Sequence, residues 1–361
     1  MDDLFRDRIE AGARRGRGAA SNRAGRFEPE TRARTEDGWE HQEDAPRRTL
    51  VHRDHPRRII TRNQSPDVPF DRSINPYKGC EHGCIYCFAR PTHEYLGLSA
   101  GLDFETRIFT KPNAAELLER ELARPGYEVA PIAVGTNTDP YQPIEKEERI
   151  MRSILEVLEA WRHPVSIVTK GALVTRDLDI LSRMARNGLV KVGISLTSLN
   201  SELSRAMEPR AAAPQVRLRA ISQLAKAGVP TGVMVAPIVP ALNDHEIEAL
   251  VSAGAKAGAG WASHVVLRLP GEVAPLFREW LMESYPKRAK RVMRYVRELH
   301  GGRDYDPAWG KRMRGEGVYA RLIARRFETA ARREGLREPR WDLDAGRFRR
   351  PERAGDQLAL F

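Results

Sequence analysis

The chain of 361 residues has only three cysteines, Cys80, Cys84 and Cys87, and all of them fall within eight positions. A chain that places its few thiols so close together is using them as ligands. Three thiolates at this spacing can wrap one loop around an iron–sulfur cube, each sulfur binding a different iron. The fourth iron is then left for a small molecule that chelates it through an amine and a carboxylate. The spacing therefore predicts a reaction centre, because an electron carrier would need four cysteines.

Three cysteines have other uses. A zinc ion would take the three thiolates together with His82 or His93, although structural zinc sites usually pair Cys-x2-Cys with a distant second half. An odd number of cysteines in a large chain argues against a disulfide scaffold. The remaining alternative is that the three cysteines are buried free thiols without a functional role. These alternatives stay open at this point.

The residue after the last cysteine is aromatic, Phe88. Cys-x3-Cys-x2-Cys followed by an aromatic resembles the cluster loop of radical S-adenosylmethionine (SAM) enzymes, in which a reduced cluster cleaves SAM into methionine and a 5′-deoxyadenosyl radical. The resemblance implies a 4Fe-4S cluster and SAM as cofactors, with Cys80, Cys84 and Cys87 as cluster ligands. It also implies flavodoxin or ferredoxin as the electron donor.

The composition is that of a soluble protein with a sizeable core. Hydrophobic residues make up 41% of the chain, and no run of about eighteen apolar residues occurs. Residues 1–6 are acidic and then basic, without an apolar signal segment. We therefore expect a cytoplasmic protein that does not bind membranes, and a reducing cytosol suits free thiolates.

Short runs rich in β-branched residues alternate with helical stretches. Strands are predicted at residues 73–75, 132–134, 165–169, 192–196, 232–235 and 265–269. Helices are predicted at residues 113–122, 146–161, 175–187, 214–226 and 244–256. Six strand–helix units in series demand a parallel sheet and are too few to close an eight-stranded barrel. We therefore predict an α/β fold, a partial (β/α)6 barrel of the radical SAM type, over residues 71–285.

The flanking segments differ in composition from this core. Residues 1–45 are rich in Arg, Gly, Ala and Glu and predict a disordered basic arm. Residues 46–70 predict an extension packed on the core. Residues 286–345 form a basic region with interleaved aromatics, and residues 346–361 a tail.

In parallel α/β sheets ligands bind at the carboxyl ends of the strands, and the cysteine loop follows the first strand. Residues just past the other strands are therefore candidates to bind SAM. Lys170 suits its carboxylate, and Thr138 or Asp139 its amine. Ser195 suits the ribose, and Pro237-Ile238 gives the adenine an apolar shelf. Each of these, taken singly, is more often a turn residue at a strand end.

From about residue 75 to residue 327 the chain is similar to the spore photoproduct lyase-like, photolyase-related branch of the radical SAM superfamily. Besides the cysteines, the resemblance rests on Thr138-Asp139, Val168-Thr169-Lys170, Ser195, Val235-Ala236-Pro237-Ile238, Tyr285-Pro286-Lys287-Arg288, Trp309-Gly310-Lys311-Arg312 and Gly315-x-Gly317-x-Tyr319. It implies that Lys170 and Ser195 contact SAM.

Two departures indicate that the chain is not the lyase itself. Lyases that repair the thymine dimer keep a cysteine as hydrogen donor where this chain has Thr136, and a hydroxyl is a far poorer hydrogen-atom donor than a thiol. They also carry tyrosines on both sides of the third cluster cysteine, whereas here Tyr86 is kept and Phe88 replaces the other. Tyr86 and Thr136 are therefore the candidate catalytic positions, with a chemistry that differs from dimer reversal.

The net charge of +11 comes almost entirely from residues 287–353, which hold about 21 Lys and Arg against about 10 Asp and Glu. Basic residues with interleaved aromatics suit a loop that tracks a phosphate backbone and stacks on a base. The alternatives are a solvated basic surface and aromatics that only pack the region on the core. We predict contact with nucleic acid, preferably DNA, through Arg291, Arg294, Lys311, Arg312, Arg314 and Tyr319.

The last five residues resemble the Gln-Leu-x-Leu-Phe peptide by which bacterial replication and repair proteins bind the sliding DNA clamp. Gln357 would fix the register, while Leu358, Leu360 and Phe361 fill an apolar groove. The alternative is an apolar terminus that docks on its own domain.

The sequence thus favours a radical SAM enzyme that repairs or modifies DNA, or less readily RNA. A second hypothesis is a non-catalytic iron–sulfur or zinc protein associated with DNA. A third keeps the radical chemistry and directs it to a protein, a tRNA or a small molecule. The sequence names neither the bond attacked nor whether SAM is consumed or regenerated.

Overall fold

The structure is a computed structural model that describes residues 9, 14, 16–27 and 48–352. Its main sheet has seven strands, and their linear order is β2-β3-β6-β7-β8-β9-β10. All neighbours from β3 to β10 are parallel, and β2 pairs antiparallel with β3 at one edge. The strands are β2 Ile60–Arg62, β3 Arg72–Ile74, β6 Ile132–Val134, β7 Val165–Thr169, β8 Val190–Ser195, β9 Thr231–Ile238 and β10 Trp261–Val266. The predicted fold class, an α/β partial barrel, is confirmed.

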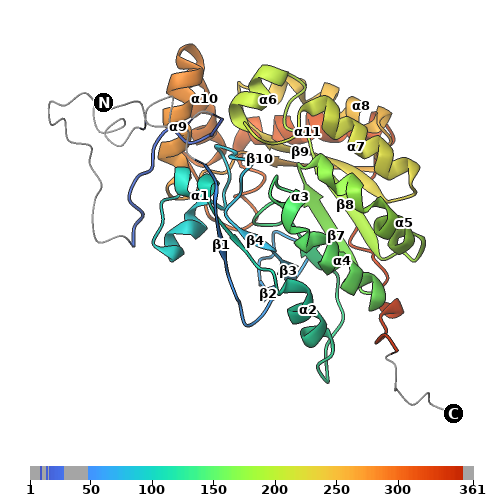
Figure 1. Cartoon of the computed structure of the whole chain (residues 1–361). Helices are drawn as coiled ribbons and strands as arrows, with labels where there is room; N and C mark the ends of the chain where they lie inside the picture. Colours follow the sequence, from blue (N-terminus) through green and yellow to red (C-terminus); the bar gives the residue numbers. More distant parts are fainter. Residues whose placement is uncertain (1–8, 10–13, 15, 28–47, 353–361) are drawn as a thin grey trace.

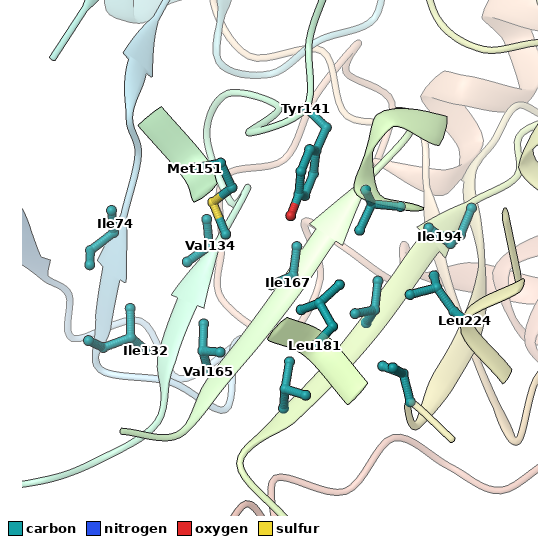
Figure 2. Close-up of a cluster of buried hydrophobic side chains, with 14 of the residues drawn as sticks. Ile74, Ile132, Val134, Tyr141, Met151, Val165, Ile167, Leu181, Ile194 and Leu224 are labelled. Carbon is teal, nitrogen blue, oxygen red and sulfur yellow. The ribbon is translucent and has the colours of Figure 1, made fainter. Parts of the chain in front are cut away.

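Helices connect the parallel strands and lie along one face of the sheet, where Figure 1 shows α4, α5, α7 and α8. The side chains between these layers form the main core, with Ile167 and Ile194 pointing from the sheet toward the helices (Figure 2). The strands are rich in fully buried β-branched residues, as is usual for a parallel sheet that is covered on both faces. The covering helices are α2 Ala114–Leu122, α4 Ile150–Ala160, α5 Leu178–Arg186, α7 Pro214–Lys226 and α8 Ile247–Lys256.

A small second sheet lies beside the barrel and carries the segment from which the cysteine loop departs. Its order is β1-β5-β4, with β1 (Leu50–Arg53) parallel to β5 (Arg107–Thr110) and β4 (Tyr77–Lys78) antiparallel to it. Residues 46–70 thus contribute one strand to each sheet, β1 here and β2 in the barrel. The described residues 48–70 are therefore hydrogen-bonded into both sheets.

Two predicted elements have different bounds in the structure. The helix predicted at residues 146–161 breaks at Arg149, whose φ of 52° separates α3 (Glu145–Glu148) from α4. The break lets the buried Glu145 carboxylate accept the Met151 N–H at 3.1 Å and the Tyr77 hydroxyl. The last strand begins at Trp261, four residues earlier than predicted, because Trp261 and Ala262 pair there with Gly232 and Val233.

The prediction of a disordered arm over residues 1–45 is wrong for residues 16–27, which we call the N-terminal strap. Its Ala19, Ala20 and Ser21 are at most 3% exposed. A segment with so few apolar residues packs because its backbone amides find buried carboxylates, as described below. The other residues of the predicted arm, except residues 9 and 14, lie outside the described part of the chain.

The basic region near the C-terminus contains two helices, α10 (Pro286–Leu299) and α11 (Gly317–Arg333), joined by a loop. α10 packs on α9 (Val273–Ser284). Residues 337–352 then run back along the amino ends of the barrel strands, where Asp344 N donates to Gly188 O and Arg349 N to Trp161 O. Within the described residues, no helix is long and apolar enough to cross a membrane.

His163 is fully buried beneath this returning segment, with Phe348 edge-on to its ring. Its two nitrogens lie 2.8 Å from the Tyr127 hydroxyl and 2.9 Å from the Pro164 carbonyl, an arrangement that suits the neutral imidazole. Burial lowers the pKa of His163 to about 4, below its usual 6.5. The folded protein therefore resists protonation at a site that the unfolded chain protonates readily.

We expect the free energy of unfolding to fall as the pH drops from 6.5 toward 4, since the unfolded state then binds a proton that the folded state refuses. The loss attributable to His163 approaches about 3 kcal/mol at pH 4. Urea unfolding at several pH values checks this, with a flatter slope expected for His163→Phe. The exposed His55→Asn is the control, and an unchanged slope in His163→Phe would contradict the prediction.

Candidate active site at the cysteine loop

The cysteine loop leaves β4 and ends at the short helix η2 (Arg90–Leu96). Cys80 and Cys84 are buried, Cys87 is partly exposed, and none of them forms a disulfide. The loop turns at Gly83, which has a φ of 67° that only glycine adopts freely. Backbone bonds from Cys80 N to Phe104 O and from Ile85 N to Met207 O, at 2.9 and 3.0 Å, fix its two ends.

A fully buried arginine, Arg90, holds the loop from inside. Its guanidinium donates to the carbonyls of Cys84 at 3.0 Å and Gly83 at 3.2 Å. It also forms an ion pair of 2.5 Å with Glu105, and both side chains are 0% exposed. Because a buried guanidinium needs acceptors for its five N–H groups, this site specifies the path of the loop. The sequence analysis missed both residues, which look like surface charges in the sequence.

The N-terminal strap is bound to the same carboxylate. The amides of Gly18 and Ala19 each donate to Glu105 at 2.8 Å. A Cβ on Gly18 would lie 1.9 Å from the Gly83 carbonyl oxygen, so the strap touches the cysteine loop itself. At its other end, Ser21 donates to Glu279 on α9 at 2.7 Å. The strap therefore covers the loop and ties it to a helix far along the chain.

The surroundings of the thiols favour ligation over reactivity of a free thiol. Burial raises the pKa of all three cysteines, and the positive charge of Lys170 partly offsets this for Cys84 and Cys87. Free thiols on one loop, with a cation beside them, are a donor set that suits a negatively charged iron–sulfur cluster. No three His, Cys, Asp or Glu side chains of the described chain lie close enough together to hold a single metal ion.

The predicted SAM residues lie around the carboxyl ends of the barrel strands, as expected. Lys170 follows β7, with Nζ 5.7 Å from the centre of the Tyr86 ring. Ser195 ends β8 and donates to the Ala236 carbonyl at 3.0 Å. Pro237 and the buried Ile238 end β9, and the bond between Ala236 and Pro237 is cis. The strand ends and the cysteine loop thus line one end of the barrel.

The two candidates for the SAM amine already have intramolecular partners. Asp139 accepts from Thr169 Oγ1 at 2.6 Å and from Lys170 N at 2.7 Å. Burial alone would raise the pKa of Asp139, but His82 and these donors lower it to about 2. The Thr138 hydroxyl donates to the Tyr77 carbonyl at 2.9 Å. Asp139 is thus an ionised side chain that positions the backbone of Lys170.

Comparison with known proteins decides the family. Residues 74–253 match the Radical SAM superfamily. The chain belongs to the radical SAM superfamily. An uncharacterized protein of Mycobacterium tuberculosis and one of Mycobacterium bovis are each 41% identical over 260 residues, which is 72% of this chain and 75% of theirs.

Solved structures of spore photoproduct lyase share the fold of this radical SAM protein. The lyase complexed with dinucleoside spore photoproduct has a TM-score of 0.58 and 18% identity, over 79% of this chain and 80% of the other. A mutant with bound AdoMet and the same dinucleoside gives a TM-score of 0.57, with the same identity and coverage. The resemblance to this branch that the sequence suggested is therefore confirmed at the level of the fold.

The two predicted catalytic positions differ in their surroundings. In this radical SAM protein the buried Tyr86 hydroxyl donates to Glu208, which also accepts from Thr197 Oγ1 at 2.6 Å and pairs with Arg217. Burial raises the pKa of Tyr86, and the charge of Glu208 raises it further. Its hydroxyl is therefore held by a buried carboxylate. Thr136 is half-buried on the loop after β6.

The predicted nucleic-acid residues fall into two groups. Arg291, Arg294 and Arg314 are exposed. The others have partners inside the protein: Arg312 pairs with Asp67, Lys311 pairs with Glu316 at 2.7 Å, and the Tyr319 hydroxyl donates to Asp244. The predicted clamp-binding residues, Gln357, Leu358, Leu360 and Phe361, lie outside the described residues.

Proposed function

We propose that this radical SAM protein is an enzyme that repairs or modifies DNA by radical chemistry. When bound, the 4Fe-4S cluster supplies the electron that cleaves SAM into methionine and a 5′-deoxyadenosyl radical. Cys80, Cys84 and Cys87 hold the cluster, with flavodoxin or ferredoxin as the electron donor. Thymine-dimer reversal by the family route is not part of the proposal, since Thr136 and Phe88 lack the hydrogen donors of that route.

The chain's own residues bind and orient SAM at the strand ends. Burial alone would lower the pKa of Lys170, but the negative charges of Cys84 and Glu208 raise it. Its side chain is therefore an ammonium group suited to the SAM carboxylate. Ser195 would contact the ribose, and Pro237-Ile238 would give the adenine an apolar surface. The SAM amine is left to a backbone carbonyl, because Thr138 and Asp139 both have intramolecular partners.

The observation that carries the proposed DNA substrate is a basic, aromatic surface beside the cysteine loop. The hydrophobic cluster that contains Cys84 and Tyr86 also contains α10 residues Ala289, Val292 and Val296. The opposite side of the same helix exposes a row of cations. The basic face of α10 therefore lies at the end of the molecule that carries the cysteine loop. Its exposed cations are Lys287, Arg288, Lys290, Arg291, Arg294 and Arg297.

Aromatic rings support this surface. The guanidinium of Arg294 lies 4.9 Å from the centre of the Tyr295 ring, and that of Arg291 lies 5.9 Å from it. Tyr295 in turn stacks on Tyr319 at 4.7 Å. Arginines held against rings lose less freedom when they bind phosphates, so this face is suited to a polyanion. Arg291 and Arg294 are thus the best-placed of the predicted residues.

We expect the double change Arg291→Glu/Arg294→Glu to weaken DNA binding about tenfold or more and to flatten its dependence on salt. Fluorescence anisotropy with a labelled duplex and a labelled single strand, across a salt series, measures both. The matched control is Arg219→Glu/Lys226→Glu on the exposed side of α7, which changes the net charge equally. Equal losses in both variants would show only non-specific attraction.

The function itself is tested by adding DNA to the reduced enzyme with SAM. We expect DNA to raise the yield of 5′-deoxyadenosine in the wild type and to raise it less in the α10 variant. If the enzyme forms 5′-deoxyadenosine but neither binds DNA nor responds to it, its substrate is instead a protein, a tRNA or a small molecule.

The C-terminal peptide is proposed to bring the enzyme to the sliding clamp, and deletion of residues 357–361 should abolish that binding.

A further inference from the structure

Arg268 lies two residues beyond β10, at the mouth of the barrel. Its neighbours Leu267 and Leu269 are each 1% exposed and belong to the hydrophobic cluster that contains Cys84 and Tyr86. Since successive side chains of an extended chain alternate in direction, two buried leucines turn the residue between them away from this cluster. The position of Arg268 is therefore set by the same core that supports the cysteine loop.

The Arg268 guanidinium lies over the ring of Phe88, 4.5 Å from its centre. Phe88 directly follows Cys87, and its side chain is 42% exposed although the next residue, Ala89, is fully buried. The backbone around Phe88 is thus fixed while its ring faces outward. A cation on an exposed ring brings a positive charge to within one residue of a proposed cluster ligand.

No acceptor within the described chain uses this guanidinium. Its Nε is buried without a hydrogen-bond partner, and no hydrogen bond or ion pair of Arg268 occurs among the described residues. Asp67, the nearby carboxylate, already accepts from Gly310 N at 2.6 Å and pairs with Arg312. An arginine that is positioned by packing and left without an acceptor is prepared for an anion from outside.

The ring also determines which ligand geometry fits. The guanidinium lies over the Phe88 ring, and its Nε is buried without a hydrogen-bond partner. In-plane pairs of N–H donors match two oxygens of a phosphate or a carboxylate. The loop after α10 lies beside Arg268, because Met313 O accepts from Val266 N. This loop carries the exposed Arg314 and the exposed Trp309, and a second cation with an aromatic ring favours phosphate as the ligand.

We propose that Arg268, held over the Phe88 ring, binds a backbone phosphate of the nucleic acid next to the reacting nucleotide. This inference rests on the proposed function. Phosphate contacts fix the register of a strand, so this pair sets which nucleotide reaches the SAM site. Phe88 is a positioning residue that acts through Arg268, and it takes the place of a hydrogen-relaying tyrosine in the related lyases.

The test is binding of a short labelled single-stranded oligonucleotide to the full chain loaded with iron and sulfide, across a salt series. We expect Arg268→Gln to weaken binding roughly tenfold for all sequences and to lower the salt slope by about one. Phe88→Leu should weaken it less, and the double variant no more than Arg268→Gln alone. Arg219→Gln on α7 is the control for lost charge, and unchanged unfolding midpoints show intact folding.

The outcomes separate this inference from the proposed function. A wild type that binds no oligonucleotide overturns both. A wild type that binds while Arg268→Gln keeps its affinity and salt slope overturns the assignment of Arg268 alone. Binding of inorganic phosphate or dTMP to the wild type that is lost in Arg268→Gln, together with unchanged oligonucleotide binding in that variant, assigns the site to a free phosphate ligand and overturns the nucleic-acid source.

Discussion

Cys84→Ala should abolish the formation of 5′-deoxyadenosine and lower the bound iron from about four atoms per chain to less than one. Cys84 is buried at the centre of the loop, and burial raises the pKa of its thiol, so only ligation makes the thiolate favourable there. With no fourth cysteine in the sequence, nothing replaces the lost ligand. Anaerobic reconstitution, iron analysis and electron paramagnetic resonance with and without SAM measure the effect.

The control for this experiment is Ser153→Ala on the exposed side of α4, which should keep both iron and 5′-deoxyadenosine. If the electron paramagnetic resonance spectrum of the wild type does not change when SAM is added, the proposal of an enzyme is contradicted. A tightly bound zinc in place of iron would contradict it too. Either result would favour a non-catalytic protein associated with DNA.

Arg90→Met is expected to destabilise the protein by about 3–5 kcal/mol, the usual loss when one partner of a buried ion pair is removed. Glu105 would be left charged and 0% exposed, and its remaining donors in the described part of the chain would be the amides of Gly18 and Ala19. The carbonyls of Gly83 and Cys84 would lose their donor too. Urea unfolding of the protein without cluster measures the loss, and iron uptake shows whether the loop still forms.

A matched comparison for Arg90 is Arg183→Met, because Arg183 and Glu159 form a more exposed ion pair of 2.6 Å on the outside of the barrel. Exposed pairs are screened by water, so this variant should unfold almost as the wild type does. If both variants showed the same small change, Arg90 would not be the residue that holds the loop. Replacing Arg90 and Glu105 together should not restore stability, since the strap amides would then lack their acceptor.

The order of strands and the place of the cysteine loop were predictable from sequence because they depend on local patterns. β-branched runs and helix-stop residues predict the strands and helices in which they occur. The alternation of strands and helices then predicts a parallel sheet. The buried pairs Arg90–Glu105 and Arg217–Glu208 were not predictable. Charged residues in a sequence normally indicate surface, and only the fold shows that these have found partners inside.

The N-terminal strap was missed for a related physical reason. Its sequence has almost no apolar residues, and such segments usually cannot offset the entropy of ordering. Here the buried acceptors Glu105 and Glu279 lie 87 and 258 residues away in sequence. The helix break at Arg149 is similar, since it depends on where the Glu145 carboxylate lies. Long-range hydrogen bonds decide these details, and a local pattern carries no information about them.

The strap has a consequence for the order of events during synthesis. Residues 16–27 are synthesised before the cysteine loop, yet the bond from Ser21 to Glu279 needs α9, which is synthesised well after that loop. The cysteine loop is therefore complete long before its cover closes. We therefore expect the three thiols to be open to iron and sulfide during synthesis, before the strap is tied to α9.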